Sequence, residues 1–310
     1  MSIETVLQSL RDDPALMRNV TAWQQAPARP ARTTSLPADL DARLAAALRS
    51  RGIDALYSHQ AAAWQAAQAG QNLVVATATA SGKTLCYNLP VAQALLADPA
   101  ARALYLFPTK ALAHDQLAEL NALQLSIVNC QLATLAPARS AGVDNYLKAA
   151  TYDGDTPQRE RGRIRREARS VLTNPDMLHT GMLPHHPQWA ELLAGLRYVV
   201  LDELHTYRGV FGSHVANVLR RLQRICRFYG SDPRFLCASA TLANPQELAQ
   251  RLIEAPVTLI DDDGSPQGER HFVFYNPPVV DPSLGLRRSS LLEAEALAAT
   301  LLAHDVQTVV

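Results

Sequence analysis

Six short apolar segments recur along the middle of the chain, each separated from the next by a stretch with helical periodicity. They are Asn72–Thr77, Ala103–Phe107, Ala149–Tyr152, Ser170–Thr173, Tyr198–Leu201 and Phe235–Ser239. These segments are mostly apolar on both faces, which is typical of parallel strands buried between two layers of helices. Right-handed crossovers then predict a doubly wound α/β domain that binds ligands at the carboxyl ends of its strands.

The pattern differs before this region. Residues 1–35 combine a short helical pattern with the stretch APARPARTTS, whose Pro and Ser content predicts a linker. An amphipathic helix then runs from Leu36 toward Gly52, a plausible helix stop. We therefore expect an N-terminal extension and linker over residues 1–35 and the α/β domain over residues 36–262.

The pattern changes again at the turn-rich DDDGSPQG. One strand (HFVFYN), a helix from about Ser289 to His304, and the apolar run VQTVV follow it. A strand without a following helix or partner strands is an unusual place for a protein to end. We expect residues 263–310 to be a linker and the truncated beginning of a second domain.

Composition supports a globular chain. Hydrophobic residues make up 48% of the 310 residues and charged residues 19%, which excludes disorder over the whole length. No apolar run approaches the ~20 residues that span a bilayer, and the first residues lack a signal-peptide pattern. We expect a cytoplasmic protein without a membrane partner. The four cysteines are far apart, which argues against a disulfide framework and against structural zinc.

Positive charge is distributed unevenly, although 29 basic residues balance 29 acidic ones. Only Lys83, Lys110 and Lys148 are lysines. Six arginines lie in Arg159–Arg169, which predicts either a face that attracts nucleic acid or a solvated helix face. A further stripe, which we interpret as solvent-facing, has helical spacing and consists of Arg220, Arg224 and Arg227.

A phosphate-binding loop is predicted at TATASGKT, which follows an apolar strand and opens a helix. Backbone N–H groups and the helix N-terminus would face the phosphates, Lys83 would add a positive charge, and the Thr84 hydroxyl would ligate Mg²⁺. Thr77 stands where the strict pattern has Gly, and Ala80 is also not Gly. The predicted ATP-binding residues are Thr77, Ala78, Thr79, Ala80, Ser81, Gly82, Lys83 and Thr84.

Acidic residues follow another apolar strand in LDELH. An acid beside a phosphate-binding loop predicts the Walker B arrangement, in which Asp202 holds Mg²⁺ and Glu203 accepts a proton from the attacking water. With Lys83, these are the candidate catalytic residues; a solvated acidic pair at a strand end is the alternative. The next strand ends in Ser239, Ala240 and Thr241.

The series GKT, DELH, SAT resembles the superfamily 2 DExH-box helicases. This resemblance implies a RecA-like P-loop NTPase domain that uses ATP and Mg²⁺. SHQ resembles the family's Q motif, in which Gln60 would recognise adenine. The resemblance also implies that His205 and the SAT residues couple hydrolysis to nucleic-acid binding.

Three further stretches, PTKALAHDQ, YDGDT and TNPDML, resemble the segments with which this family contacts the sugar–phosphate backbone of one strand. The alternative for Lys110 is a solvated lysine. The implied nucleic-acid contacts are Pro108, Thr109, Lys110, Gly154, Asp155, Thr173, Asn174 and Pro175.

The stretches ATATASGKTLCYNLPV, HTYRGVFGSHVANVLRRL and SATLANPQEL resemble the bacterial MrfA/YprA-type DNA-repair helicases. This implies an ATP-dependent DNA helicase with single-stranded DNA as its partner. The family's second RecA-like domain, with its arginine finger, has no counterpart here, so we expect the chain alone to be inactive. Two alternatives stay open: a nucleotide- and single-strand-binding module without turnover, and an RNA-directed DExH helicase.

Overall fold

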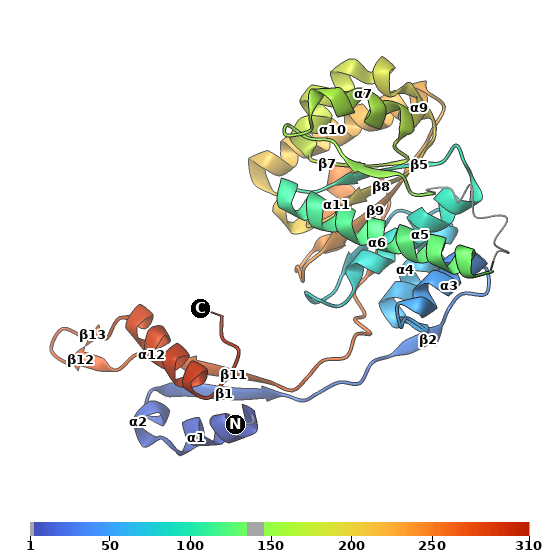
Figure 1. Cartoon of the computed structure of the whole chain (residues 1–310). Coiled ribbons are helices and arrows are strands. Elements are labelled where there is room, and N and C mark those ends of the chain that lie inside the picture. Colours follow the sequence, from blue (N-terminus) through green and yellow to red (C-terminus); the bar gives the residue numbers. More distant parts are fainter. Residues whose placement is uncertain (1–2, 135–145, 310) are drawn as a thin grey trace. The chain divides into compact units, whose positions relative to one another are not determined.

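The computed structural model describes residues 3–134 and 146–309, and the chain divides into two compact units (Figure 1). The larger unit is Ala31–Ser265. The smaller unit combines Met1–Pro30 with Pro266–Val310. The two ends of the sequence therefore belong to one unit, although a long α/β region separates them in the sequence.

A seven-stranded parallel sheet forms the centre of the larger unit, with strand order β10-β4-β9-β8-β5-β7-β6. The strands are β4 Leu73–Ala76, β5 Arg102–Leu106, β6 Ala149–Thr151, β7 Ser170–Thr173, β8 Leu196–Leu201, β9 Arg234–Ser239 and β10 Thr258–Ile260. All six predicted strands are present, which confirms the parallel α/β fold. The prediction missed β10, because three residues between Pro256 and a run of aspartates are too short to show a strand pattern.

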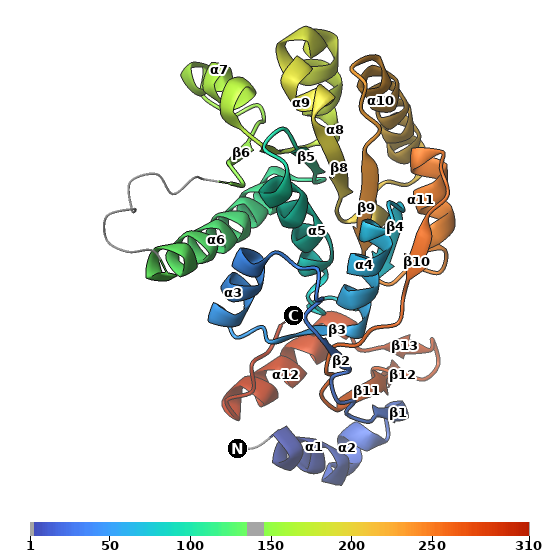
Figure 2. The same cartoon turned by 90° about the vertical axis from the view of Figure 1, so that its right-hand side faces the viewer.

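Helices cover both faces of this sheet, because successive strand residues point to opposite sides. Val75 of β4 packs against the core under α3 to α6, and Val74 packs against the core under α9 to α11. Figure 2 shows α5 and α6 on one side of β8 and β9, with α10 and α11 on the other. The helices are α3 Ala42–Ser50, α4 Ser58–Gln68, α5 Lys83–Ala97, α6 Lys110–Thr134, α7 Gln158–Glu167, α9 Ala190–Ala194, α10 Gly209–Phe228 and α11 Pro245–Ile253.

The first of these helices is shorter than predicted. It begins at Ala42 rather than near Leu36, because the Asp41 carboxylate accepts the Arg43 backbone N–H at 2.9 Å and caps the helix there. Its C-terminal stop is as expected, since Gly52 has φ +76°. The residues before it form β2 (Thr33–Ser35), which pairs with β3 (Ala55–Tyr57) instead of remaining a linker.

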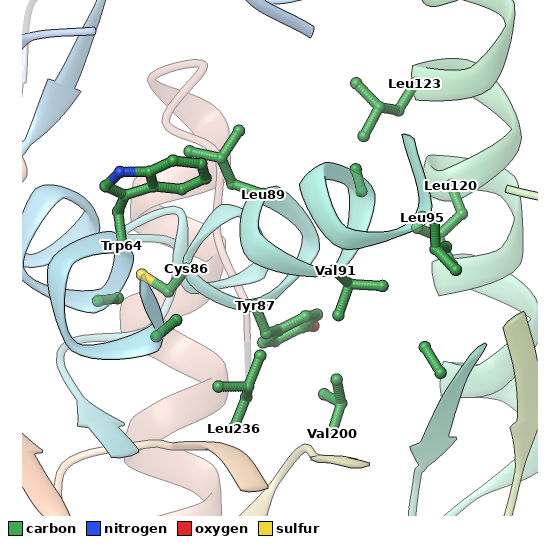
Figure 3. Packing of buried hydrophobic residues seen from close by; sticks show 14 of the residues in the cluster. Trp64, Cys86, Tyr87, Leu89, Val91, Leu95, Leu120, Leu123, Val200 and Leu236 are labelled. Carbon is green, nitrogen blue, oxygen red and sulfur yellow. The ribbon is translucent and has the colours of Figure 1, made fainter. Parts of the chain in front are cut away.

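Among the helices α3 to α6, which cover one face of the sheet, α5 is the most completely buried. Figure 3 shows Tyr87 and Val91 of this helix directed toward Val200 and Leu236 of the sheet. These side chains are at most 2% exposed, and burial of each contributes about 2 kcal/mol to folding. This packing holds the start of α5 in a fixed position at the edge of the sheet.

Short irregular helices connect the remaining elements of the larger unit. Together they carry the chain from β7 to β8 and from β8 to α10. They are α8 Pro175–Met177, η2 Leu178–Met182, η3 Leu183–Trp189 and η4 Leu204–Thr206.

The smaller unit contains an antiparallel ribbon of β1 (Val20–Ala26) and β11 (Arg270–Tyr275). The predicted C-terminal helix is present as α12 (Ser290–Ala303). The apolar run after Asp305 is not a strand over the described residues 306–309, contrary to expectation. The unit's other elements are α1 Ile3–Asp12, α2 Pro14–Met17, β12 Val279–Asp281 and β13 Leu286–Arg287.

The basic cluster does not form one uniform solvated face. The Arg169 side chain is buried, and its guanidinium donates to the backbone carbonyls of Tyr146 at 2.9 Å, Leu95 at 2.8 Å and Asp98 at 2.5 Å. Arg161 turns back to the carbonyls of Thr156 and Asp153. Arg169 thus joins the start of β7 to the end of α5 and belongs to the interior.

We expect Arg169→Met to lower the free energy of unfolding by about 3 kcal/mol, because buried carbonyls would lose their donor. Chemical denaturation measures this loss. Arg166→Met is the matched control, since Arg166 is exposed on α7 and should change stability by no more than about 0.5 kcal/mol. Equal stability of the Arg169 variant and the parent would contradict the structural role.

Candidate nucleotide and nucleic-acid site

Six of the segments singled out in the sequence lie at the carboxyl ends of strands of the large sheet, whereas SHQ lies at the start of α4. The P-loop, the SAT residues and DELH follow β4, β9 and β8, which are neighbours in the sheet. The segments PTK, TNP and YDGDT follow β5, β7 and β6, which are also neighbours. The edge of the sheet is therefore divided into two adjoining halves, one for each kind of predicted contact.

The P-loop connects β4 to α5. Gly82 precedes the helix with φ +80°, and Lys83 is its first residue. The Lys83 ammonium donates to the carbonyls of Thr77 at 3.0 Å and Ala78 at 2.7 Å. Burial lowers the pKa of Lys83, although the carboxylates of Glu203 and Asp202 act in the opposite direction. The loop thus holds a positive charge at a helix N-terminus, where an anion binds favourably.

The departures from the strict P-loop pattern have distinct structural settings. The Thr77 hydroxyl lies 2.7 Å from the Ser81 hydroxyl, and both residues are buried. A threonine at this position therefore closes the loop with a hydrogen bond that Gly could not make. Ala80, in contrast, has φ +63°, a left-handed conformation that is strained for any residue with a Cβ.

Gln60 supports the P-loop from α4. Its side-chain oxygen accepts the Tyr57 backbone N–H at 2.9 Å, and its side-chain nitrogen donates to the Gly82 carbonyl at 3.1 Å. A Cβ on Gly82 would lie 2.8 Å from this nitrogen. Only a glycine at position 82 allows the Q motif to approach the loop this closely.

His59 and Asp263 form a second support that the sequence did not reveal. The ring of His59 lies between the Ser81 carbonyl at 3.0 Å and the Gly264 N–H at 3.2 Å. The Asp263 carboxylate accepts the Ala78 N–H at 3.2 Å. The DDDG stretch, which resembled a simple junction, therefore fixes the P-loop backbone.

A cavity of about 630 Å³ adjoins the P-loop. Gln60, Gly82 and Thr84 line it on the P-loop side, and Tyr57 adds an aromatic side chain. Arg51, which follows α3, and Glu119 of α6 also line the cavity, and they form an ion pair. No sequence signal joined these distant residues.

Asp202 is largely buried at the end of β8. Its carboxylate accepts the Glu203 backbone N–H at 2.8 Å and the Tyr87 hydroxyl at 3.0 Å. Burial raises the pKa of Asp202, and these two hydrogen bonds counteract it. The Thr84 side chain lies near the same hydroxyl, where it acts to lower the pKa of Tyr87 against the effect of burial.

Thr84 and Asp202 fit a Mg²⁺ ion. A hydroxyl and a carboxylate are hard oxygen donors, and Mg²⁺ is usually bound by one or two protein groups together with water and phosphate. Within the described residues, no group of three or more His, Cys, Asp or Glu side chains could hold a metal alone. The donor set therefore suits a nucleotide-associated Mg²⁺ better than a closed structural metal site.

The remaining DELH and SAT residues lie beside Asp202. Glu203 has φ +50°, and its carboxylate lies 3.2 Å from Nδ1 of His205, without hydrogen-bond alignment. The Ser239 hydroxyl is buried without a hydrogen-bond partner among the described residues. Ala240 and Thr241 follow Ser239 at the surface. Thus the structure pairs His205 with Glu203 and leaves a buried hydroxyl at the same edge.

Lys110 begins the half of the edge that is predicted to contact nucleic acid. Its ammonium pairs with the Asp155 carboxylate at 2.7 Å, and both side chains are exposed. Their hydrogen bond raises the pKa of Lys110 and lowers that of Asp155. Gly154 lies next to this pair, since a Cβ there would be 3.6 Å from the Lys110 nitrogen. The half-buried Pro108 leads into this turn, where the Thr109 hydroxyl accepts the Leu112 N–H at 3.4 Å.

The residues after β7 are more constrained. Thr173 is buried and donates from its hydroxyl to the Tyr152 carbonyl at 2.6 Å. The Asn174 side chain caps α8 by accepting the Met177 N–H at 2.8 Å, and Pro175 is buried. In this conformation, the side chains of Thr173 and Asn174 are engaged within the domain.

Comparison with known proteins identifies the family of the chain. Residues 57–248 match the DEAD/DEAH box helicase family. The chain belongs to the DEAD/DEAH box helicases. The matched range includes the P-loop, DELH, SAT and the three predicted nucleic-acid segments.

Individual helicases are similar over most of the chain. The ATP-dependent helicase YprA of Bacillus subtilis is 53% identical over 94% of the chain, and the ATP-dependent helicase HRQ1 of Saccharomyces cerevisiae is 42% identical over 82%. A crystal structure of the DUF1998 helicase MrfA bound to DNA and AMPPNP is 50% identical, covers 99% of the chain and has a TM-score of 0.89. These similarities confirm the predicted RecA-like fold and the MrfA/YprA-type resemblance.

The chain is short compared with these helicases. It covers 37% of YprA, 22% of HRQ1 and 40% of the MrfA chain. Among its described residues, none of the helices combines the length and apolar character needed to cross a bilayer.

The strained backbone of Ala80 yields a prediction about the stability of the P-loop. We expect Ala80→Gly to raise the free energy of unfolding by about 1 kcal/mol without nucleotide, because glycine accepts the left-handed conformation. Differential scanning calorimetry measures the change.

Ala78→Gly is the matched control, because Ala78 lies in the same loop without a positive φ. It should lose about 0.5–1 kcal/mol. Two variants that change stability in the same direction would show that the conformation of Ala80 is not the cause.

Proposed function

We propose that the chain is the ATP-binding N-terminal part of an ATP-dependent DNA helicase that acts in DNA repair in the cytoplasm. The observation that carries this proposal is the division of one sheet edge between P-loop, SAT and DELH on β4, β9 and β8, and three strand-contact segments on β5, β7 and β6. The similar crystal structure of MrfA bound to DNA and AMPPNP supports a chain that binds both a nucleic acid and a nucleotide.

Each residue of the nucleotide half has a proposed task. Lys83 and the backbone N–H groups of residues 77–84 bind the phosphates, Gln60 recognises adenine from the adjoining cavity, and Thr84 and Asp202 hold Mg²⁺. A bound Mg²⁺ supplies neutralisation of phosphate charge. Glu203 accepts a proton from the attacking water.

Coupling is proposed for His205 and the SAT residues. His205 contacts the proposed base Glu203 directly, and Ser239 offers a buried hydroxyl that lacks a partner among the described residues. A buried hydroxyl without a partner costs free energy. A rearrangement that satisfies it would therefore be favourable once nucleotide binds, which suits a segment that responds to the state of the site.

The proposed nucleic-acid half binds one strand through its phosphates. Lys110 provides an exposed ammonium, and Gly154 allows close backbone approach beside it. Because phosphate contacts carry no base information, binding should show little sequence preference and weaken steeply with salt. Single-stranded DNA is the proposed ligand of this surface.

A second RecA-like domain is proposed to complete the enzyme, beginning within residues 263–310. In the described part of the chain, sixteen large hydrophobic residues are exposed, and twelve of them lie in the smaller unit, including Phe272 and Phe274 of β11. Exposed apolar surface of this kind is typical of an interaction site. The proposed second domain would also provide an arginine finger, for which the sequence analysis found no candidate in the large unit.

We expect Lys83→Ala to remove detectable binding of Mg-ATP, because it deletes the fixed positive charge at the phosphates. Isothermal titration calorimetry measures this loss, and circular dichroism checks that the fold is intact. Lys148→Ala is the control, since Lys148 precedes β6 at the opposite end of the sheet, and it should bind like the parent. Equal affinity of the Lys83 variant and the parent would refute the P-loop assignment.

For nucleic acid, we expect Lys110→Gln to weaken binding of single-stranded DNA about threefold to fivefold, as for loss of one exposed charge contact. The slope of log affinity against log salt should fall by about 0.7. Fluorescence anisotropy at several salt concentrations measures both effects. With Lys148→Gln as control, an equal loss in the two variants would indicate a general charge effect instead.

The 310-residue chain should bind ATP without DNA-stimulated hydrolysis, because an arginine finger contributes about 10³–10⁵ in rate and, in our proposal, a second RecA-like domain supplies it. Steady-state ATPase assays with and without single-stranded DNA test this, beside a longer protein that includes a second RecA-like domain. Substantial stimulated turnover by the short chain would contradict the expectation. Matched DNA and RNA duplexes, given to the longer protein, distinguish a DNA helicase from an RNA-directed one.

A further inference from the structure

The hydroxyl of Tyr87 lies where the two halves of the site meet. Tyr87 is 2% exposed and comes one helical turn after Thr84 on α5. Its hydroxyl is 3.0 Å from the Asp202 carboxylate and 3.2 Å from the side-chain oxygen of Gln116. Figure 3 shows the ring between α5 and the sheet, over Leu236 and Val200.

This hydroxyl has more partners than it can donate to. A phenol carries one proton, whereas both Asp202 and Gln116 offer acceptor oxygens. Burial, together with the nearby Asp202 carboxylate, raises the pKa of Tyr87 well above its usual range, so the proton is retained. The Tyr87 hydroxyl can therefore donate to only one of two acceptors at a time, Asp202 in the DELH segment or Gln116 on α6.

Without nucleotide, the hydrogen bond from Tyr87 to Asp202 is favoured over the one to Gln116. Hydrogen bonds to an ionised acceptor are stronger than those to a neutral amide, and the distance to Asp202 is the shorter one. Thr84 and Asp202 are also the two proposed Mg²⁺ ligands. If Asp202 engaged a metal, its carboxylate would be drawn from Tyr87, and Gln116 would be the remaining acceptor of the Tyr87 hydroxyl.

Gln116 belongs to the element that begins the nucleic-acid half. It lies on α6, six residues after Lys110, which corresponds to about 9 Å along the helix. The preceding Thr109 and Lys110 form the turn into this helix and carry the predicted phosphate contact. A new hydrogen bond at Gln116 would therefore stabilise the first turns of α6.

We propose that Tyr87 is a positioning residue that transfers its hydrogen bond from Asp202 to Gln116 when nucleotide binds, and thereby orders the Lys110 end of α6 for nucleic acid. This inference rests on the proposed function, because it requires Thr84 and Asp202 to engage Mg-nucleotide. It gives the two halves of the sheet edge a direct link inside one domain.

The structure contains a matched comparison for this role. Tyr105 is fully buried on the neighbouring β5, and its ring centre lies 6.1 Å from that of Tyr87. Its hydroxyl donates to the Asn88 side chain at 3.0 Å, away from both Asp202 and Gln116. Tyr105→Phe thus removes a buried hydroxyl from the same core without touching the proposed link.

Hydrogen exchange, measured with and without Mg²⁺ and AMPPNP, tests the proposal on the 310-residue chain. In the parent, nucleotide should slow exchange of the amides of residues 111–117 about fivefold, the equivalent of one hydrogen bond of about 1 kcal/mol. Tyr87→Phe and Gln116→Met should each lose this slowing while AMPPNP still binds, as calorimetry can establish. Tyr105→Phe should retain it.

Each other outcome overturns the inference. Slowing that persists in Tyr87→Phe, or that disappears equally in Tyr105→Phe, removes Tyr87 from the link. A parent that binds AMPPNP without slowing at residues 111–117 refutes the link but leaves the proposed function intact. A parent that does not bind AMPPNP refutes the proposed function and the inference together.

Discussion

Parallel pairing of the central strands determines where all the chemistry lies. The β4–β9 register sets Ala76 level with Ser239, and the β8–β9 register sets Leu201 level with Cys237. The residues that follow these positions are the P-loop, the SAT segment and DELH. Because every strand runs in the same direction, each emerges at the same edge. A shift in register at β9 would separate Ser239 from both of its neighbours.

Structural costs are concentrated at this edge. Ala80 and Glu203 have left-handed backbone conformations, and the Ser239 hydroxyl is buried without a partner in the described part of the chain. Burial also opposes the charged forms of Lys83 and Asp202. Such unfavourable features persist where packing of the surrounding structure stabilises the fold by more than they cost. They often occur at functional sites. The two hydrophobic cores on either side of the sheet provide this stabilisation.

Much of the fold could be predicted because buried parallel strands have a simple signature. Apolar runs such as Tyr198–Leu201 are visible without any knowledge of their neighbours, and an acid directly after such a run must lie at the edge. The same logic failed for β10, whose three residues are too few to form a pattern. It also failed for Arg169, because a basic cluster in the sequence does not reveal which arginine is buried and donates to three backbone carbonyls.

Contacts between distant segments were the least predictable part of the site. His59 meets Gly264 across about 200 residues, and β1 pairs with β11 at the other end of the chain. In neither pair does the sequence of one segment contain a motif that predicts contact with the other. The Tyr87 hydroxyl belongs to the same class, since LCYNLP reads as a buried helix and only its packing places one hydroxyl beside both Asp202 and Gln116.

The boundary between the two halves of the edge lies between β8 and β5. There the Asp202 backbone N–H donates to the Leu106 carbonyl at 3.2 Å, so the first residue of DELH is fixed to the strand that leads into the Lys110 turn. Backbone at this junction has little freedom, because both strands are buried and paired. Any signal that crosses it within this domain must therefore be carried by side chains that can exchange partners. Among the polar groups described at the junction, a hydroxyl that faces two acceptors has this property, whereas the backbone hydrogen bonds beside it do not.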